Sequence, residues 1–125
     1  MAKFKFRDLL IWQSAIIVGD KLIDISEKSE EIKKFRFAEQ LRGAALSVSN
    51  NIAEGSGSNS AADFKRFLNY AHRSIFENAN ILLVLNLRLL VSDKDLADLL
   101  EDLDILARMI SSFSKSLKKR SAILS

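Results

Sequence analysis

The segment from Leu96 to Leu117 constrains the fold more than any other part of the chain. Its apolar residues recur at alternating spacings of three and four: Leu96, Leu99, Leu103, Leu106, Ile110, Phe113 and Leu117. This spacing places their side chains on one side of an α-helix, as in a helix of an antiparallel bundle or coiled coil. Proline, the main interrupter of helices, is absent from the chain. The pattern therefore predicts an all-α protein.

Apolar periodicity and turn residues divide the chain into four helices. A chain of 125 residues is most simply one domain, so we expect a single up-and-down antiparallel four-helix bundle over residues 1–125. The expected helices are residues 7–26, 31–54, 61–90 and 93–118. Gly55 is a candidate C-cap of the second helix, and Ser92 is a candidate N-cap of the fourth.

The first and third helices carry more apolar side chains than one small core can bury. Each has a second apolar stripe: Leu9, Leu10, Ile16, Ile17 and Ile23 in the first helix, and Phe76, Leu83, Leu87 and Leu90 in the third. Apolar surface left outside the core favours self-association, so we expect an oligomer. The alternative is one overfilled monomeric core, because apolar atoms are common on ordinary protein surfaces.

A polar stripe follows the second helix through the segment QLRGAALSVSNNIAEG. Its members carry neutral amides, a hydroxyl and one carboxylate, and the stripe ends at a glycine: Gln40, Ser47, Asn50, Asn51, Glu54 and Gly55. We interpret it as a structural motif, a buried hydrogen-bond network that fixes the register of the helices. The alternative is a site that presents amides to a ligand. Small residues beside it, such as Gly43, favour close approach of two helix backbones.

Three ordered motifs carry a family resemblance: FRDLLIWQSA, QLRGAALSVSNNIAEG and FKRFLNYAHRSIFE. The chain resembles the four-helix bundle proteins encoded by intervening sequences in bacterial large-subunit ribosomal RNA genes, also labelled S23 ribosomal proteins. The resemblance implies a cytoplasmic, bacterial homopentamer with no established catalytic activity. It also implies a relation to the accessory variability determinant proteins of diversity-generating retroelements, in which a basic pentamer engages RNA and a reverse transcriptase. Gly43 stands where the family usually has a second arginine after Arg42, so part of a basic pair is missing.

Basic residues form the candidate nucleic-acid surface: Lys33, Lys34, Arg36, Arg42, Lys65, Arg66 and Arg73. Lys33, Lys34 and Arg36 lie at the expected start of the second helix, where the helix dipole is also positive. Cations at this end do not stabilise a helix, so helix stability does not explain their presence. Those from residue 65 onward form a ridge on the third helix with His72, beside Tyr70. A net charge of +3 permits RNA or DNA binding. The alternative is a solvated face with local ion pairs such as Arg73 with Glu77.

The sequence offers little for catalysis, and we expect no enzyme activity, metal site or cofactor. One histidine and no cysteine exclude the common zinc cages. Arg66 and His72 enclose five residues, as in the motif of the all-helical HEPN ribonucleases, but a regular helix leaves the two side chains about 120° apart. A ribonuclease is therefore a remote alternative.

The expected role is an accessory or scaffold protein whose partners are copies of itself, nucleic acid, and a reverse transcriptase or another nucleic-acid enzyme. The closer alternative is a purely protein-binding structural scaffold. The apolar run from Ile81 to Val91 is interrupted by Asn86 and Arg88 and is much shorter than the ~20 residues of a membrane span, so we expect no membrane partner.

Overall fold

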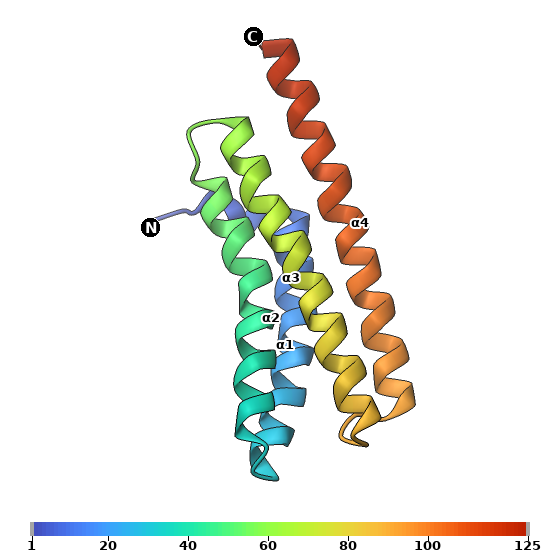
Figure 1. Ribbon diagram of the computed structural model, residues 1–125. Coiled ribbons are helices and arrows are strands. Elements are labelled where there is room, and N and C mark those ends of the chain that lie inside the picture. The colour runs from blue at the N-terminus through green and yellow to red at the C-terminus, as the bar shows by residue number, and fades with distance from the viewer. Residues whose placement is uncertain (1, 125) are drawn as a thin grey trace.

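Four α-helices run alternately up and down in the computed structural model (Figure 1). It describes residues 2–124, with side chains for residues 2–117. After a short 3-10 helix η1 (Lys5–Asp8) come α1 (Leu10–Glu31), α2 (Phe35–Ser56), α3 (Ala61–Leu87) and α4 (Asp93–Leu124). No β-strand occurs among the described residues, and none of their helices is long and apolar enough to span a membrane. The predicted all-α four-helix bundle is confirmed.

The core is formed by one apolar stripe from each helix. Its largest fully buried side chains include Leu22, Leu41, Ile52, Leu68, Leu82, Leu85, Leu103, Leu106 and Ile110. Burying one such side chain contributes about 1.5–3 kcal/mol, so the stripes supply most of the driving force for folding. Leu99 of the predicted α4 stripe is also buried, whereas Leu96, Phe113 and Leu117 are partly buried against the same core.

The fourth helix packs unevenly on the other three. It contacts α3 along much of its length and contacts α1 far less. Figure 1 shows its C-terminal part leaning away from the bundle and running past the α2–α3 loop. An ion pair between Lys21 Nζ and Asp102 Oδ2, at 2.9 Å, joins α1 to α4. The most extensive packing therefore occurs at the α1–α2 and α2–α3 interfaces.

The first helix continues to Glu31, past its expected end at residue 26. Ser26 and Ser29 are buried in this extra part, and their hydroxyls donate to the carbonyls of Ile23 (2.6 Å) and Ile25 (3.1 Å). Because these hydroxyls find acceptors on the preceding turn, serine does not end the helix here. The loop that follows is three residues, and Lys33 and Lys34 lie in it rather than in α2.

Two helices end in Schellman turns whose left-handed residue is not glycine. These residues are Lys33 after α1, with φ 64°, and Leu89 after α3, with φ 61°. At the second turn, the N–H of Leu90 donates to Leu85 O at 2.9 Å and the N–H of Leu89 donates to Asn86 O at 3.0 Å. This turn ends α3 at Leu87 rather than at residue 90.

Leu89→Gly should raise the free energy of unfolding by about 1 kcal/mol, because glycine adopts positive φ without the clash that leucine suffers. Leu89 is 92% exposed, so little packing is lost. Urea denaturation measures the change. The matched control is Leu87→Gly, which removes a leucine that is 81% exposed from the last turn of α3 and should lower stability by up to about 1 kcal/mol. A loss of stability in both variants would show that Leu89 is not strained.

Gly55 lies inside the last turn of α2, and the C-cap is Gly57 instead. A Cβ atom placed on Gly55 would lie 2.8 Å from both Phe64 Cδ1 and Phe67 Cβ, so α2 and α3 meet closely here. A Cβ atom on Gly43 would meet nothing within 4 Å. Gly43 itself therefore takes no part in a close helix contact. Helix α3 approaches α2 closely at Gly55 and also at Ala44, whose carbonyl accepts from Asn78 Nδ2 at 2.9 Å.

Candidate nucleic-acid interface

The predicted basic residues fall into two groups at opposite ends of the bundle. Lys33 and Lys34 lie in the α1–α2 loop, and Arg36 follows in the first turn of α2. The other group, Lys65, Arg66 and Arg73, lies in the first half of α3. Because α2 and α3 are antiparallel and adjacent, the start of α2 and the start of α3 are at opposite ends (Figure 1). One protomer thus presents two separate basic areas, not one continuous surface.

Arg42 forms an ion pair between two helices of the bundle, at its surface. Its Nη2 donates to Glu30 Oε2 at 2.8 Å, which joins α2 to the last turns of α1. The hydrogen bond that Arg42 donates to Glu30 raises the pKa of the Arg42 guanidinium above its ordinary value. This carboxylate balances much of the charge of Arg42. Arg42 therefore attracts a phosphate less strongly than the sequence alone suggests.

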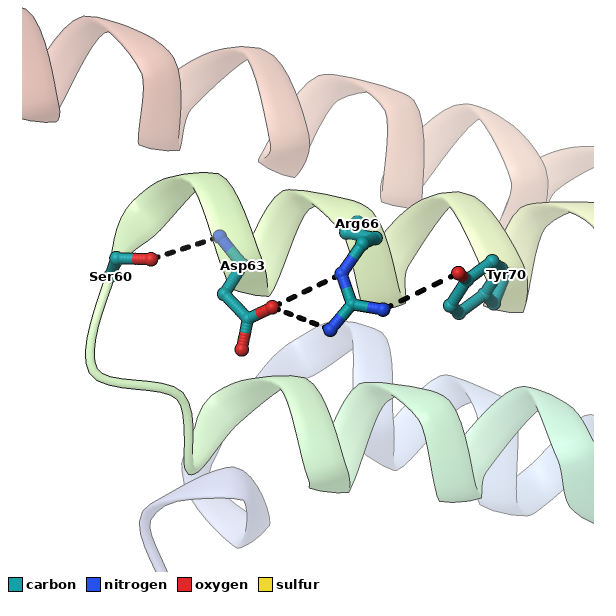
Figure 2. Close-up of polar contacts among 4 residues, drawn as sticks. All are labelled: Ser60, Asp63, Arg66 and Tyr70. Carbon is teal, nitrogen blue, oxygen red and sulfur yellow. Dashed lines mark hydrogen bonds and ion pairs between the residues drawn. The ribbon is translucent and has the colours of Figure 1, made fainter.

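Arg66 is held along the surface of α3 by its neighbours (Figure 2). Its Nε and Nη2 donate to Asp63 Oδ1 at 3.1 Å and 2.6 Å, and Nη1 donates to the Tyr70 hydroxyl at 3.4 Å. The guanidinium carbon also lies 4.9 Å from the ring centroid of Phe67, a cation–π contact. The hydrogen bonds from Arg66 lower the pKa of the Asp63 carboxyl below its ordinary value. Asp63 therefore stays ionised and neutralises Arg66.

Ser60 fixes the position of Asp63 at the start of α3. The backbone N–H of Asp63 donates to Ser60 Oγ at 3.1 Å, which is an N-cap (Figure 2). An acidic side chain in the first turn also interacts favourably with the helix dipole. The same contacts thus start α3 and place the carboxylate that balances Arg66. The predicted N-cap of α4 is likewise confirmed, since the N–H of Asp95 donates to Ser92 Oγ at 3.1 Å.

Lys65 and Arg73 are the unpaired cations of the α3 group. Both are exposed, and neither makes an ion pair within residues 2–117. The alternative pairing of Arg73 with Glu77 does not occur there. Eight residues along a helix turn the chain by about 80° beyond two full turns, so Lys65 and Arg73 share one broad side of α3. This side is the strongest candidate for phosphate contacts.

Arg66 and His72 have different neighbours. The His72 ring lies 5.2 Å from the ring of Phe76, in the groove between α3 and α4, whereas Arg66 contacts Asp63 and Tyr70. The structure does not bring the two side chains of the ribonuclease-like spacing to one site.

Part of the predicted polar motif forms a real contact between α2 and α3. The hydroxyls of Ser47 and Ser74 are 2.7 Å apart and share a hydrogen bond across the two helices. Asn51 Nδ2 donates to the Ser47 carbonyl at 2.8 Å and to its hydroxyl at 3.1 Å. These residues are half-buried. They link the two helices at one level of the bundle.

The remaining members of the motif do not join this network. Gln40, Asn50 and Glu54 are exposed, so the expectation that they are buried is corrected. Asn50 lies on the side of α2 opposite the buried residues Leu41, Val48 and Ile52, so it faces away from the core. Gln40 and Glu54 lie seven residues before and after the half-buried Ser47, close to it in angle, and their longer side chains reach water from this position.

Asn78 is the buried polar residue that sequence reasoning missed. It is fully buried in α3, and its Nδ2 donates to Ala44 O of α2 at 2.9 Å and to Ser74 O at 2.8 Å. Its Oδ1 has no hydrogen-bond partner within the described residues. A signal was present, because Asn78 lies three residues after Ile75 and four before Leu82, on the apolar stripe of α3.

A comparison with known families identifies one match. The profile of the family described as 23S rRNA-intervening sequence protein matches residues 7–112, which include α1, α2, α3 and most of α4. No curated protein matches the chain.

Proposed function

Because the chain belongs to the family of 23S rRNA-intervening sequence proteins, we propose that it is a non-enzymatic accessory protein that self-associates and binds RNA through a basic surface. The observation that carries the proposal is the pair of exposed, unpaired cations Lys65 and Arg73 on one side of α3. The family description refers to ribosomal RNA, which makes RNA the first nucleic acid to test, before DNA.

The basic surface of one protomer is small, so the proposal includes assembly. Lys65 and Arg73 are too few for tight binding alone, but an oligomer repeats them, and several weak patches then act on one long ligand. The cations at the other end, Lys33, Lys34 and Arg36, would add a second ring of charge. Each phosphate contact releases a counterion, which makes binding weaker as salt rises.

Exposed apolar side chains support self-association. Leu9, Ile23 and Leu90 of the second stripes pack partly against the core. The exposed members of these stripes are Leu10, Ile16, Ile17, Phe76, Leu83 and Leu87. Large apolar side chains left exposed on a helical bundle favour contact with another chain. The family resemblance makes a homopentamer the expected form. Sedimentation should give five times the 14.0 kDa of one chain, and a mass of one chain would contradict assembly.

Lys65→Gln and Arg73→Gln should each weaken RNA binding. Each should also reduce the slope of log K against log salt by about 1 for every copy of the residue that contacts a phosphate in the assembled protein. Arg66→Gln should have a smaller effect, since Asp63 already balances its charge. Fluorescence anisotropy of a labelled single-stranded RNA, titrated at several salt concentrations between roughly 50 and 200 mM, measures both quantities.

The control variant is Lys28→Gln, an exposed cation on α1. It should leave the slope unchanged. Binding that depends neither on salt nor on Lys65 and Arg73 would contradict the RNA proposal.

The second candidate function is a protein-binding scaffold, which the exposed apolar side chains of α1 and α3 also favour. A reverse transcriptase or another nucleic-acid enzyme is the class of partner to test. An assembled protein that retains no RNA at low salt would favour this function. The ribonuclease alternative predicts cleavage of the same labelled RNA that is lost in His72→Ala, and intact RNA with both proteins would remove it.

A further inference from the structure

A groove between α3 and α4 borders the basic surface at Lys65 and the exposed apolar stripe of α3 at Phe76. It encloses about 520 Å³, within the 300–1,000 Å³ of typical small-molecule sites. Its floor is apolar and is formed by Ile75, Phe76, Ala79, Leu100, Leu103 and Ala107. An apolar hollow of this size is large enough to hold the aliphatic or aromatic part of a small ligand.

The groove continues into a second hollow of about 360 Å³ toward the start of α3. The two hollows share His72, Ser111 and Lys115, so they form one groove. The side chains of this second part are mostly polar or basic, and they include Lys65, Asn69 and Ser114. The groove nevertheless has a mainly apolar surface throughout, and its lysines lie toward the end nearer the start of α3.

The charge at this end of the groove is uncompensated. Lys65 and Lys115 both line it, no carboxylate does, and neither lysine makes an ion pair within the described side chains. The one carboxylate of the first hollow, Asp104, already accepts from Arg108 Nη2 at 2.7 Å. An anionic group between the two lysines would be attracted, whereas a cation would be repelled.

Small side chains of α4 explain why the groove exists. Ala107, Ser111 and Ser114 face α3 where larger side chains would fill the space between the helices. The α4 residues that line the groove run from Leu100 to Lys115, a rise of about 22 Å along the helix. The groove is thus long and narrow, which suits an extended chain better than a compact ring.

We infer that this groove binds an amphiphilic organic anion, such as a medium-chain fatty acid. Its carboxylate lies between Lys65 and Lys115, with Asn69, His72 and Ser111 as hydrogen-bonding groups nearby. Its aliphatic chain lies along the apolar floor toward Phe76 and Leu100. Burial of methylene groups supplies the affinity, at about 0.8 kcal/mol each, and the lysines select the charge.

Dodecanoate, kept below its micelle concentration, is the probe for isothermal titration calorimetry. We expect saturable binding of one molecule per chain. Dodecyltrimethylammonium has the same tail and the opposite charge, and it should bind at least tenfold more weakly. Butanoate has the same headgroup and a short tail, and it should show no saturable binding.

Two variants test the two ends of the groove separately. Lys115→Gln should weaken dodecanoate binding about tenfold and leave binding of dodecyltrimethylammonium unchanged or stronger. Ser111→Phe fills the groove and should abolish binding of both. The matched controls are Lys28→Gln and Asn50→Phe, at exposed positions away from the groove, and neither should change binding. Thermal melting of each variant checks that it folds.

Three results would overturn the inference: no saturable dodecanoate binding, equal affinity for the cationic amphiphile, or full binding in Ser111→Phe. A second copy of the chain is the rival occupant. In that case Ser111→Phe would lower the mass seen in sedimentation and dodecanoate would not bind. Lys115 and Ser111 play no part in the proposed RNA surface, so failure here leaves that proposal untouched.

Discussion

Asn78→Asp should lower the free energy of unfolding by about 3–5 kcal/mol at pH 7. The Asn78 side chain is fully buried, and its amide nitrogen donates to two carbonyl oxygens, Ala44 O and Ser74 O. A carboxylate in its place would be desolvated and would face two acceptors with no proton to offer. Chemical denaturation, by circular dichroism, measures the loss.

The loss in Asn78→Asp should be smaller at low pH. Burial and the two carbonyls raise the folded-state pKa of the introduced carboxyl above its unfolded value of about 4. A group with a raised folded pKa is least unfavourable below the unfolded pKa and becomes more destabilising as pH rises through the folded pKa. Denaturation at pH 4 and at pH 7 should therefore show a gap to the unmodified protein that widens with pH.

Asn50→Asp is the matched control for this variant. Asn50 is exposed on α2, so the same chemical change there should alter stability by less than about 0.5 kcal/mol. If Asn78→Asp were as stable as Asn50→Asp at pH 7, the buried amide contact between α2 and α3 would not exist in solution.

Gly55→Ala should destabilise the protein by about 1–3 kcal/mol, although alanine is the better helix former. The added methyl group would lie 2.8 Å from Phe67 Cβ, an atom fixed by the backbone of α3, and 2.8 Å from Phe64 Cδ1. The two helices must separate to accept it, which loosens the contacts around them. Urea denaturation or thermal melting measures the change.

Gly43→Ala makes the same substitution where the structure leaves space. Gly43 is an exposed residue inside α2, and a Cβ atom there meets nothing within 4 Å. This variant should stabilise the protein by about 0.5–1 kcal/mol through helix propensity alone. We expect the change in the free energy of unfolding to have opposite signs for the two substitutions. A gain of stability in both variants would contradict the close packing at Gly55.

The fold was readable from the sequence because the apolar period of α4 and the serine N-caps act locally. Leu99, Leu103 and Leu106 follow a spacing that requires a helix with one buried side. The C-terminal ends of α1 and α3 could not be predicted in the same way. The residues with left-handed backbone after these helices are Lys33 and Leu89, whereas glycine, or sometimes asparagine, usually occupies such a position.

Only part of the candidate site could be predicted from the sequence. The free charge and the hydrogen bonds of a side chain depend on its neighbours, and some of these neighbours lie on another helix. Ser47 and Asn51 lie in the predicted polar motif, but their partner Ser74 lies on another helix. Asp63, three residues earlier, balances the charge of Arg66. The pattern of basic residues alone does not reveal this ion pair. Asn78 was missed because asparagine is usually exposed, although its position on the apolar stripe of α3 indicates burial.

The uneven packing of α4 has a consequence for how the protein opens. Local unfolding costs least where an element buries the fewest contacts with the rest of the chain. Helix α2 packs extensively on both α1 and α3, whereas α4 rests mainly on α3 and contacts α1 far less. We therefore expect α4 to detach first, before α1, α2 and α3 separate. Hydrogen exchange should then show lower protection for the amides of α4 than for those of α2 and α3, which exchange only on global unfolding.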